Sequence, residues 1–438
     1  RCDSGAFKRV MGFVMQSDSD VIVMKNILNE VCDTYDIPYI HIGADEVKIQ
    51  NKNFLPQMVS LIESKGKKVV GWEPGGNFSP SVIRQLWGDD AGITGSEQGF
   101  RQIDSRNLYI NHMDAEESVI SIFNHEVDNA LQGDNQKIGA TLCLWNDRRL
   151  NTGEDNLTQN PVYPAMLAFA ERSWCGGGYG IDNKVSLSDT ASSEYKDFSA
   201  FENRLIDIKK EFFTQLPFPY VKQQNVHWQL IGPYDNGGDL SGSFAPEKEN
   251  FDFANAKNAM LVNGATIILR HFWNPVVKGI LSDQKENTTY YAYAKYWSDA
   301  DTTTQMWLGF YDFSRSTATD PPKANTWNNL QSKIWLNGKT IAPPQWQRAG
   351  QQGNSEIPYV DENYYFRKPA EVGLKKGWNT ILIKLPAGKF NSGIWYAPVK
   401  WMFTAVFIKH DRNGTNWKQD ARFYDRYVIR DIHSLVFL

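Results

Sequence analysis

The sequence lacks long apolar runs, and its charges are nearly balanced. No apolar run in the 438-residue chain reaches the length that spans a lipid bilayer. The net charge is −4, without a basic cluster or an acidic tail. A nucleic-acid-binding surface needs concentrated positive charge. We therefore expect neither a membrane span nor a nucleic-acid partner.

Cysteine and histidine are also scarce. The four cysteines lack the Cys-x-x-Cys spacing of zinc sites, and the seven histidines are scattered without the spacing of metal ligands. These patterns exclude a zinc-stabilised domain and a disulfide scaffold. We expect no metal and no cofactor.

Aromatic residues, in contrast, are plentiful, with 15 Trp and 19 Tyr. Aromatic faces stack on the C–H faces of sugar rings, which favours a protein that handles carbohydrate. Trp and Tyr also fill the cores and strands of large β-rich proteins. The count alone leaves both interpretations open.

The first half of the chain is organised around the stretch from Tyr39 to Val47. An apolar run leads to Gly43, and the adjacent carboxylates Asp45 and Glu46 follow. This pattern predicts a short buried strand with both carboxylates at its C-terminal tip, where parallel α/β barrels place catalytic groups. Two adjacent carboxylates repel each other when both are ionised, so one tends to stay protonated, and glycoside cleavage uses one acid and one base. Most Asp-Glu pairs are solvated loop charges, and only the strand-end context favours function here.

The segment His41-Ile42-Gly43-Ala44-Asp45-Glu46 resembles the signature of the family 20 glycoside hydrolases, the β-N-acetylhexosaminidases. The family usually has Gly where Ala44 stands, and both carboxylates are kept. The resemblance implies a TIM-barrel, (β/α)8 fold and the hydrolysis of glycosides that end in N-acetylhexosamine.

The strand-and-tip pattern recurs after Glu46. Five strands, each with a polar or aromatic residue at its C-terminal end, are expected over residues 39–47, 68–73, 82–87, 107–114 and 139–147. Apolar residues at helical spacing predict helices from Ser17 or Asp18 to about Val31, over 54–64, around 166–174 and up to about Phe213. The alternation predicts parallel α/β architecture, and the repeated tips favour a barrel.

Later strand tips extend the resemblance. The hexosaminidases have Trp at the ends of their fifth, sixth and eighth strands and Tyr-x-Asp at the seventh, and the corresponding residues here are Trp72, Trp87, Trp145 and Asp114. There are two departures. His112 stands where the family has Tyr, which changes how the acetamido carbonyl oxygen is held. Asp147 stands where the family often has Glu, which shortens a group that binds sugar hydroxyls.

The resemblance also implies that part of the barrel is missing. The family's Asp-Glu pair lies on its fourth strand, so this chain holds strands 4–8, and the first three would precede Arg1. We expect residues 1–220 to be the C-terminal part of a TIM-barrel catalytic domain. An open half-barrel exposes strand edges and core at high cost, so a missing N-terminal segment or a partner chain is expected to complete it.

Residues 221–438 have the composition of an all-β domain. Short strands separated by turns predict a β-sandwich or jelly roll, similar to the galactose-binding-like domains of bacterial glycosidases. Asn337-Gly338 predicts a hairpin. Trp346, Trp395 and Trp401 are candidates for sugar contact, with core packing as the favoured interpretation.

The resemblance implies a retaining, substrate-assisted reaction, in which the sugar's acetamido oxygen attacks its own anomeric carbon. Glu46 would serve as general acid and then as base. Asp45 would orient the acetamido N–H and stabilise the cationic intermediate. The residues expected to wall the pocket or bind the sugar are Trp72, Trp87, His112, Asp114, Trp145 and Asp147.

Two other interpretations stay open. One is a glycan-binding protein with a decayed or incomplete hexosaminidase site. The other is a glycosidase of another barrel family, although its nucleophile and acid would come from separate strands. The expected partner is a glycan or oligosaccharide with a terminal N-acetylhexosamine, and the substrate class predicts an extracytoplasmic location.

Overall fold

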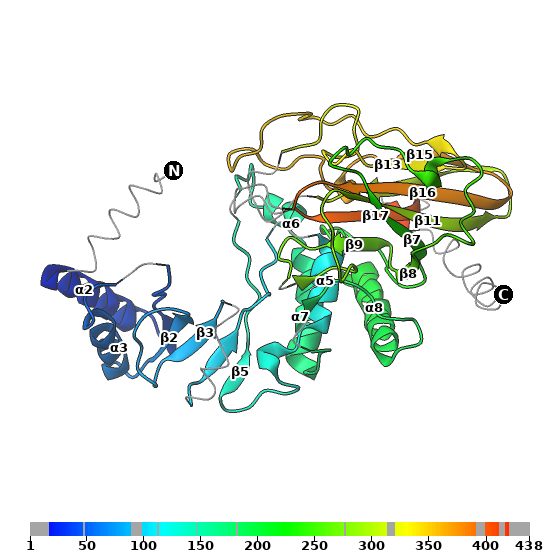
Figure 1. Cartoon of the computed structure of the whole chain (residues 1–438). Coiled ribbons are helices and arrows are strands. Elements are labelled where there is room, and N and C mark those ends of the chain that lie inside the picture. Colours follow the sequence, from blue (N-terminus) through cyan, green and yellow to red (C-terminus); the bar gives the residue numbers. More distant parts are fainter. Residues whose placement is uncertain are drawn as a thin grey trace. The chain divides into compact units, whose positions relative to one another are not determined.

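The computed structural model describes residues 17–46, 49–88, 99–111, 114–146, 148–180, 183–275, 277–312, 320–390, 399–410 and 417–419 (Figure 1). The chain divides into two compact units that interleave along the sequence. Unit 1 comprises Arg1–Tyr109, Glu126–Cys143 and Glu171–Ile181, and unit 2 comprises Ile110–His125, Leu144–Ala170 and Asp182–Leu438. The domain boundary predicted at residue 220 stays a prediction.

A five-stranded parallel sheet forms the centre of unit 1, in the order β1-β2-β3-β4-β5. Its strands are β1 (Tyr39–His41), β2 (Lys68–Glu73), β3 (Ile83–Leu86), β4 (Gln102–Asp104) and β5 (Lys137–Ala140). All four neighbouring pairs are parallel, so the C-terminal ends of the strands line one edge of the sheet. The expected parallel α/β architecture is confirmed.

Two helices pack with the first strands. Helix α2 (Asp18–Thr34) begins with a capping box, in which the Ser17 side chain accepts from the Asp20 N–H and Asp20 accepts from the Ser17 N–H. Helix α3 (Phe54–Ser64) is followed by Gly66, whose φ of +75° suits a helix end. The core shared by these helices, β1 and β2 includes Val21, Leu28, Ile40, Leu55, Met58, Ile62 and Val69. Both helices are as predicted.

The prediction of the fourth strand at 107–114 is wrong, because β4 lies upstream of it, whereas β5 overlaps the predicted fifth strand, 139–147, at Gly139 and Ala140. Outside β4 and β5, the two expected segments also meet in an isolated parallel bridge between Tyr109 and Cys143. A turn explains the shift of β4. The Leu108 N–H bonds back to the Ser105 carbonyl, and Asn107 has a left-handed φ of +56°, which ends extended structure.

Further helices belong wholly or partly to unit 2: α5 (Ala115–Asn124), α6 (Asp155–Gln159), α7 (Val162–Cys175) and α8 (Ser193–Phe212). Short 3₁₀ turns are η1 (Val127–Asn129), η2 (Ala245–Glu247) and η3 (Tyr364–Phe366). Helices α7 and α8 match the expected helices. The sequence did not predict α5, whose residues from Ala115 to Phe123 are all buried although Glu116, Glu117, Ser118 and Ser121 are polar.

Two antiparallel sheets make up much of unit 2. One has the order β14-β13-β16-β11-β7-β8, and the other contains β15-β12-β17-β18, with β9 also paired to β17. Their strands are β7 (His227–Asp235), β8 (Ala259–Asn263), β9 (Thr266–Arg270), β11 (Thr288–Ser298), β12 (Thr302–Gly309), β13 (Lys333–Leu336), β14 (Lys339–Thr340), β15 (Ala370–Leu374), β16 (Gly377–Ala387), β17 (Trp401–His410) and β18 (Trp417–Gln419). A small parallel pair joins β6 (Asn183–Lys184) to β10 (Val277–Lys278). The predicted change to β structure beyond residue 221 is confirmed.

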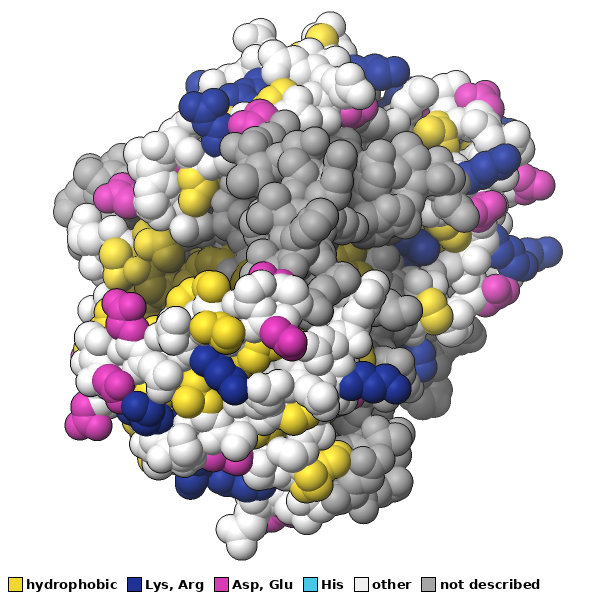
Figure 2. All heavy atoms as spheres, turned by 90° about the vertical axis from the view of Figure 1, so that its left-hand side faces the viewer, with side chains coloured by type: hydrophobic (Ala, Val, Ile, Leu, Met, Phe, Trp, Pro, Cys, Tyr) yellow, Lys and Arg dark blue, Asp and Glu magenta, His cyan; other side chains and the backbone are white. Residues whose placement is uncertain are grey.

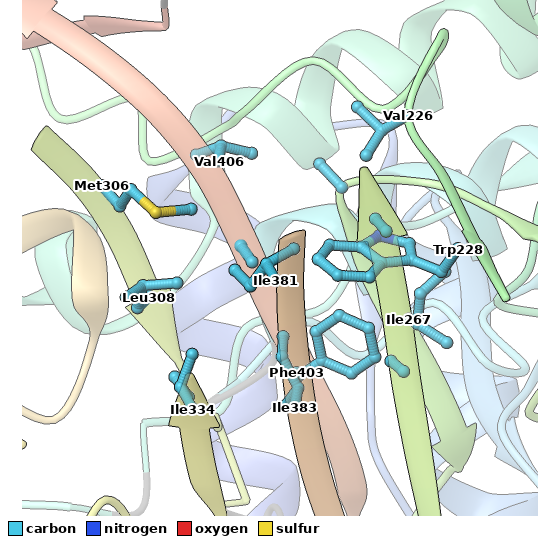
Figure 3. Close-up of a cluster of buried hydrophobic side chains, with 14 of the residues drawn as sticks. Val226, Trp228, Ile267, Met306, Leu308, Ile334, Ile381, Ile383, Phe403 and Val406 are labelled. Atoms are coloured by element: carbon cyan, nitrogen blue, oxygen red, sulfur yellow. The ribbon is translucent and has the colours of Figure 1, made fainter. Parts of the chain in front are cut away.

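Side chains from both antiparallel sheets share one hydrophobic core (Figure 3). Trp228 of β7 meets Phe403 of β17 edge-on, with ring centroids 5.0 Å apart. Trp346 and Trp401 are only 9% and 1% exposed, so the packing interpretation holds for both, while Trp395 lies outside the described residues. The predicted hairpin is confirmed at Asn337-Gly338, where both φ angles are positive.

Candidate active site

The loop after β1 carries the two adjacent carboxylates. Gly43, Ala44 and Glu46 have φ angles of +68°, +78° and +53°, so the backbone is left-handed on both sides of Asp45. Glycine adopts such angles freely, whereas an alanine there costs about 1–2 kcal/mol. The position where Ala replaces the Gly of the resembled signature is therefore a strained one. Asp45 is half-buried, and Glu46 is exposed.

Backbone contacts tie this loop to β2. The Ile42 N–H donates to the Val70 carbonyl at 2.9 Å, and the Gly43 carbonyl accepts from the Trp72 N–H at 3.0 Å. The loop after β2 approaches closely, because a Cβ added to Gly75 would lie 2.1 Å from the Trp72 carbonyl oxygen and 3.1 Å from that of Ala44. Only glycine fits there. These contacts hold the carboxylate loop beside the tip of β2.

The next two strand tips carry the expected tryptophans. The Trp72 ring meets the His41 ring edge-on, with centroids 5.0 Å apart. Trp87 follows β3, and its indole N–H donates to the Pro74 carbonyl at 2.9 Å. Both indoles are half-buried. The residues of the predicted site that unit 1 brings to one edge of its sheet are Asp45, Glu46, Trp72 and Trp87.

Three hydrogen-bonded polar side chains, His41, Gln85 and Ser105, lie beside these tips, and the sequence did not predict the last two as part of the site. The Nδ1 atom of His41 accepts from the Gly43 N–H at 3.0 Å, and the His41 side chain also hydrogen-bonds to Gln85. The Gln85 amide donates to the Ser105 hydroxyl at 2.8 Å. Partial burial lowers the pKa of His41, against the opposing effects of the Asp45 charge and the Gln85 hydrogen bond. Gln85 and Ser105 belong to no motif, and their positions near strand ends are the only sequence signal.

The remaining described residues of the predicted site, Asp114 and Trp145, belong to unit 2. Asp114 is completely buried and caps α5, because its Oδ1 accepts from the Glu116 N–H at 3.0 Å. Trp145 is 50% exposed, and its backbone N–H donates to the Asn111 side chain at 3.4 Å. His112 and Asp147 lie outside the described residues.

Asp114 and Glu116 form a pair of buried acids. Burial, assisted by the charge and hydrogen bond of Asp114, raises the pKa of Glu116 well above its usual range. Glu116 also accepts from the Tyr364 hydroxyl at 2.7 Å and from the Val221 N–H at 3.0 Å. The pair therefore joins α5 to segments far along the chain.

Glu117, the next residue of α5, is held in the ionised form, whereas the raised pKa of Glu116 favours the protonated form. It accepts hydrogen bonds from Lys400 Nζ at 2.9 Å and from His271 Nε2, and all three side chains are fully buried. Burial alone would raise the pKa of Glu117, but His271 and Lys400 outweigh it and hold the pKa at about 2. The sequence signal for both acids is an adjacent Glu pair between Ala115 and Ser118.

Metal binding and membrane insertion find no support in the part of the chain that the structure describes. No group of three or more His, Cys, Asp or Glu side chains there is arranged to hold a metal ion. No helix among the same residues has the length and apolar character needed to cross a membrane.

Comparison with known proteins gives similarities to solved structures alone. No protein-family model matches the chain, and no curated protein matches it. The chitobiase of Flavobacterium johnsoniae is 20% identical over 44% of this chain and 33% of its own, with a TM-score of 0.31. The family 20 β-N-acetylhexosaminidase of Streptomyces coelicolor is 17% identical over 45% and 42%, with a TM-score of 0.35. The N-acetyl-β-hexosaminidase of Streptomyces plicatus, in complex with Thio-NAglucal, is 16% identical over 47% and 45%, with a TM-score of 0.31.

The chain thus spans between a third and a half of the length of these structures. TM-scores near 0.3 do not establish a common fold.

Proposed function

We propose that this protein is a glycoside hydrolase that removes terminal β-linked N-acetylhexosamine by a retaining, substrate-assisted mechanism. One observation carries the proposal. Asp45 and Glu46 are adjacent at the tip of β1, and Trp72 and Trp87 follow at the next two tips of the same parallel sheet. The resemblance of residues 41–46 to the family 20 signature supports the same reaction.

The geometry suits the two carboxylates to separate tasks. Glu46 is exposed, so it can reach a leaving-group oxygen as general acid and later activate water as base. Asp45 is half-buried and stays close to the loop, where it can accept the acetamido N–H and stabilise the cationic intermediate. The indoles of Trp72 and Trp87 offer apolar walls for the acetamido methyl group. No enzyme nucleophile is needed, because the acetamido oxygen forms the new bond to the anomeric carbon.

The finer architecture is part of the proposal: a (β/α)8 barrel in residues 1–220 and a β-sandwich in residues 221–438. Strand β1 is the first strand of the described sheet and has a partner on one side. Nearby apolar side chains are exposed, with Tyr39 at 44% and, on α2, Ile22 at 60% and Ile27 at 47%. Figure 2 shows hydrophobic side chains on the face toward which α2 and α3 lie in Figure 1. Among the described residues, this edge of β1 has no paired strand, and with the apolar surface beside it this supports further strands and helices, from this protein or a partner chain, that pair with β1.

A glycan-binding protein without turnover is the second candidate. The burial of Asp114 as a helix cap favours it, because this side chain is then not available to sugar hydroxyls as the family resemblance implies. An extracytoplasmic location is proposed with either function.

The direct test is Glu46→Gln in the complete protein, assayed with an aryl 2-acetamido-2-deoxy-β-glycoside. Loss of general acid–base catalysis is expected to lower kcat/KM by about 10²–10⁴-fold. Glu63→Gln is the matched control, because Glu63 is an exposed carboxylate on α3. It is expected to keep wild-type turnover.

A second substrate tests the chemistry. The corresponding 2-hydroxy glycoside lacks the acetamido oxygen, so the wild-type protein is expected to leave it nearly intact. Equal rates on both glycosides would rule out substrate assistance, and full activity of Glu46→Gln would exclude Glu46 as the acid. Binding of an N-acetylhexosamine oligosaccharide without hydrolysis of either glycoside would favour the second candidate.

A further inference from the structure

His41 lies at the centre of the contacts that shape the carboxylate loop. Its Nδ1 atom accepts a hydrogen bond from the Gly43 N–H at 3.0 Å. An acceptor nitrogen carries no proton, so in the neutral ring the proton is on Nε2. The remaining hydrogen bond of the ring, to Gln85, is then donated from Nε2 to the amide oxygen. The structure thereby defines one neutral tautomer.

Gln85 is itself oriented by the next strand. Its amide nitrogen donates to the Ser105 hydroxyl at 2.8 Å, which leaves the amide oxygen toward His41. The Ser105 backbone N–H donates to the Leu86 carbonyl at 2.9 Å. Gln85 and Ser105 are 7% and 0% exposed, so their hydrogen bond is shielded from water, whereas His41 at the other end is exposed. It links β1 to β3 and to the residue after β4.

Gly43 is the point at which this chain meets the carboxylates. Its N–H is held by His41, and its carbonyl is held by the Trp72 N–H at 3.0 Å. The left-handed residues Ala44 and Glu46 follow directly. Such conformations persist where the surrounding contacts impose them. The His41 ring also packs edge-on against Trp72, so one side chain contacts both the loop and the first indole of the site.

We propose that His41 is a positioning residue. Its unprotonated Nδ1 atom accepts the Gly43 N–H and so orients the loop that carries Asp45 and Glu46. Gln85 and Ser105 fix the tautomer of His41. The catalytic consequence rests on the proposed function, whereas the control of the loop does not. Protonation of Nδ1 would remove the acceptor and release Gly43. Asp45 is the charged side chain that acts on the ring, and the facing side chains on β2 and β3, Trp72 and Gln85, do not titrate.

A matched pair of variants tests the proposal in the complete protein. His41→Asn places a side-chain oxygen near the position of Nδ1 and keeps the acceptor. His41→Phe keeps a flat ring against Trp72 and removes the acceptor. With the aryl 2-acetamido-2-deoxy-β-glycoside, His41→Phe is expected to lower kcat about 100-fold with little change in KM, because displacement of a catalytic group by about 1 Å costs this much. His41→Asn is expected to stay within about tenfold of the wild type.

Hydrogen–deuterium exchange over residues 42–46 gives a readout that needs no turnover. His41→Phe is expected to exchange faster than the wild type, and His41→Asn is expected to stay protected. The wild type is expected to lose protection as the pH falls below the lowered pKa of His41, and His41→Asn is not. Wild-type exchange and kcat in His41→Phe would overturn the proposal. An equal loss of kcat and of exchange protection in His41→Phe and His41→Asn, at equal thermal stability, would also overturn it. If the wild type hydrolyses no glycoside but the exchange pattern holds, the proposed function fails and the positioning role stands.

Discussion

Replacing Glu117 by Gln isolates the energetic role of the buried charge cluster that joins α5 to the antiparallel sheets. The substitution keeps the shape of the side chain and removes its charge, so the ammonium of Lys400 stays buried without its carboxylate. Two unit charges 2.9 Å apart interact by about 6 kcal/mol at an effective dielectric constant of about 20. Removal of one member of a buried pair typically costs about 3–5 kcal/mol, because the other charge is left uncompensated.

The pKa of Glu117 gives an independent figure. It is about 2 in the folded protein against a usual value of 4.5, so the folded state favours the ionised form by about 3 kcal/mol. A lowered acid pKa stabilises the protein above the unfolded value, and this contribution is lost as the pH falls from about 4.5 to about 2. Both routes therefore predict a loss of about 3–5 kcal/mol at pH 7 for Glu117→Gln.

The assay is urea unfolding of the complete protein at pH 7 and at pH 3, followed by tryptophan fluorescence. Asp207→Asn on α8 is the matched control, because Asp207 forms an exposed pair with Lys210 and is expected to change stability by less than about 1 kcal/mol. Adding Lys400→Met to Glu117→Gln removes the uncompensated charge and is expected to restore part of the loss. A Glu117→Gln protein as stable as the control at pH 7 would refute the reasoning.

Two other acids give distinct expectations. Asp114→Ala is expected to lose about 1 kcal/mol of stability, measured by thermal unfolding, because α5 loses its cap, whereas Asp114→Asn keeps a capping oxygen and is expected to lose less. Equal losses in the two variants would contradict the capping role. Burial, assisted by the charge of Asp104, raises the pKa of Asp128 to about 6, so ionisation of Asp128 costs the folded protein about 3 kcal/mol as the pH rises from about 4 to above 6. Asp128→Asn is expected to flatten this part of the stability–pH curve, and a curve with the wild-type slope would argue against the shift.

Local patterns predicted the elements that depend on local contacts. Ser17 caps α2, Gly66 follows α3, and Asn337-Gly338 turns the hairpin, because each depends on residues a few positions apart. The strand tips at Glu46, Trp72 and Trp87 were visible for the same reason. The shift of β4 was not, since it depends on a turn at Asn107, just before the apolar residues Leu108, Tyr109 and Ile110 that predicted a strand.

The position of Asp114 depends on contacts that the sequence does not reveal. The family resemblance predicted that Asp114 binds sugar, and in the structure its side chain caps α5, whose residues from Ala115 to Phe123 are all buried. The partners of that helix, Tyr364, His271 and Lys400, lie more than 150 residues further along the chain. Such long-range pairing leaves no periodic signal in the sequence. The orientation of Gln85 toward His41 is hidden for a related reason, since it depends on strand register.

The interleaving of the two units bears on how the protein is made. Helix α5 leaves the ribosome before its partners, because His271 follows Glu117 by 154 residues and Lys400 follows it by 283. Until those residues are synthesised, α5 lacks the residues that bury it, and Glu117 lacks its two basic partners. Non-local contacts of this kind slow folding and prolong the exposure of aggregation-prone surface. Folding of unit 2 is therefore expected to finish only after Lys400 has emerged, and neither unit corresponds to one continuous fragment that can be expressed alone.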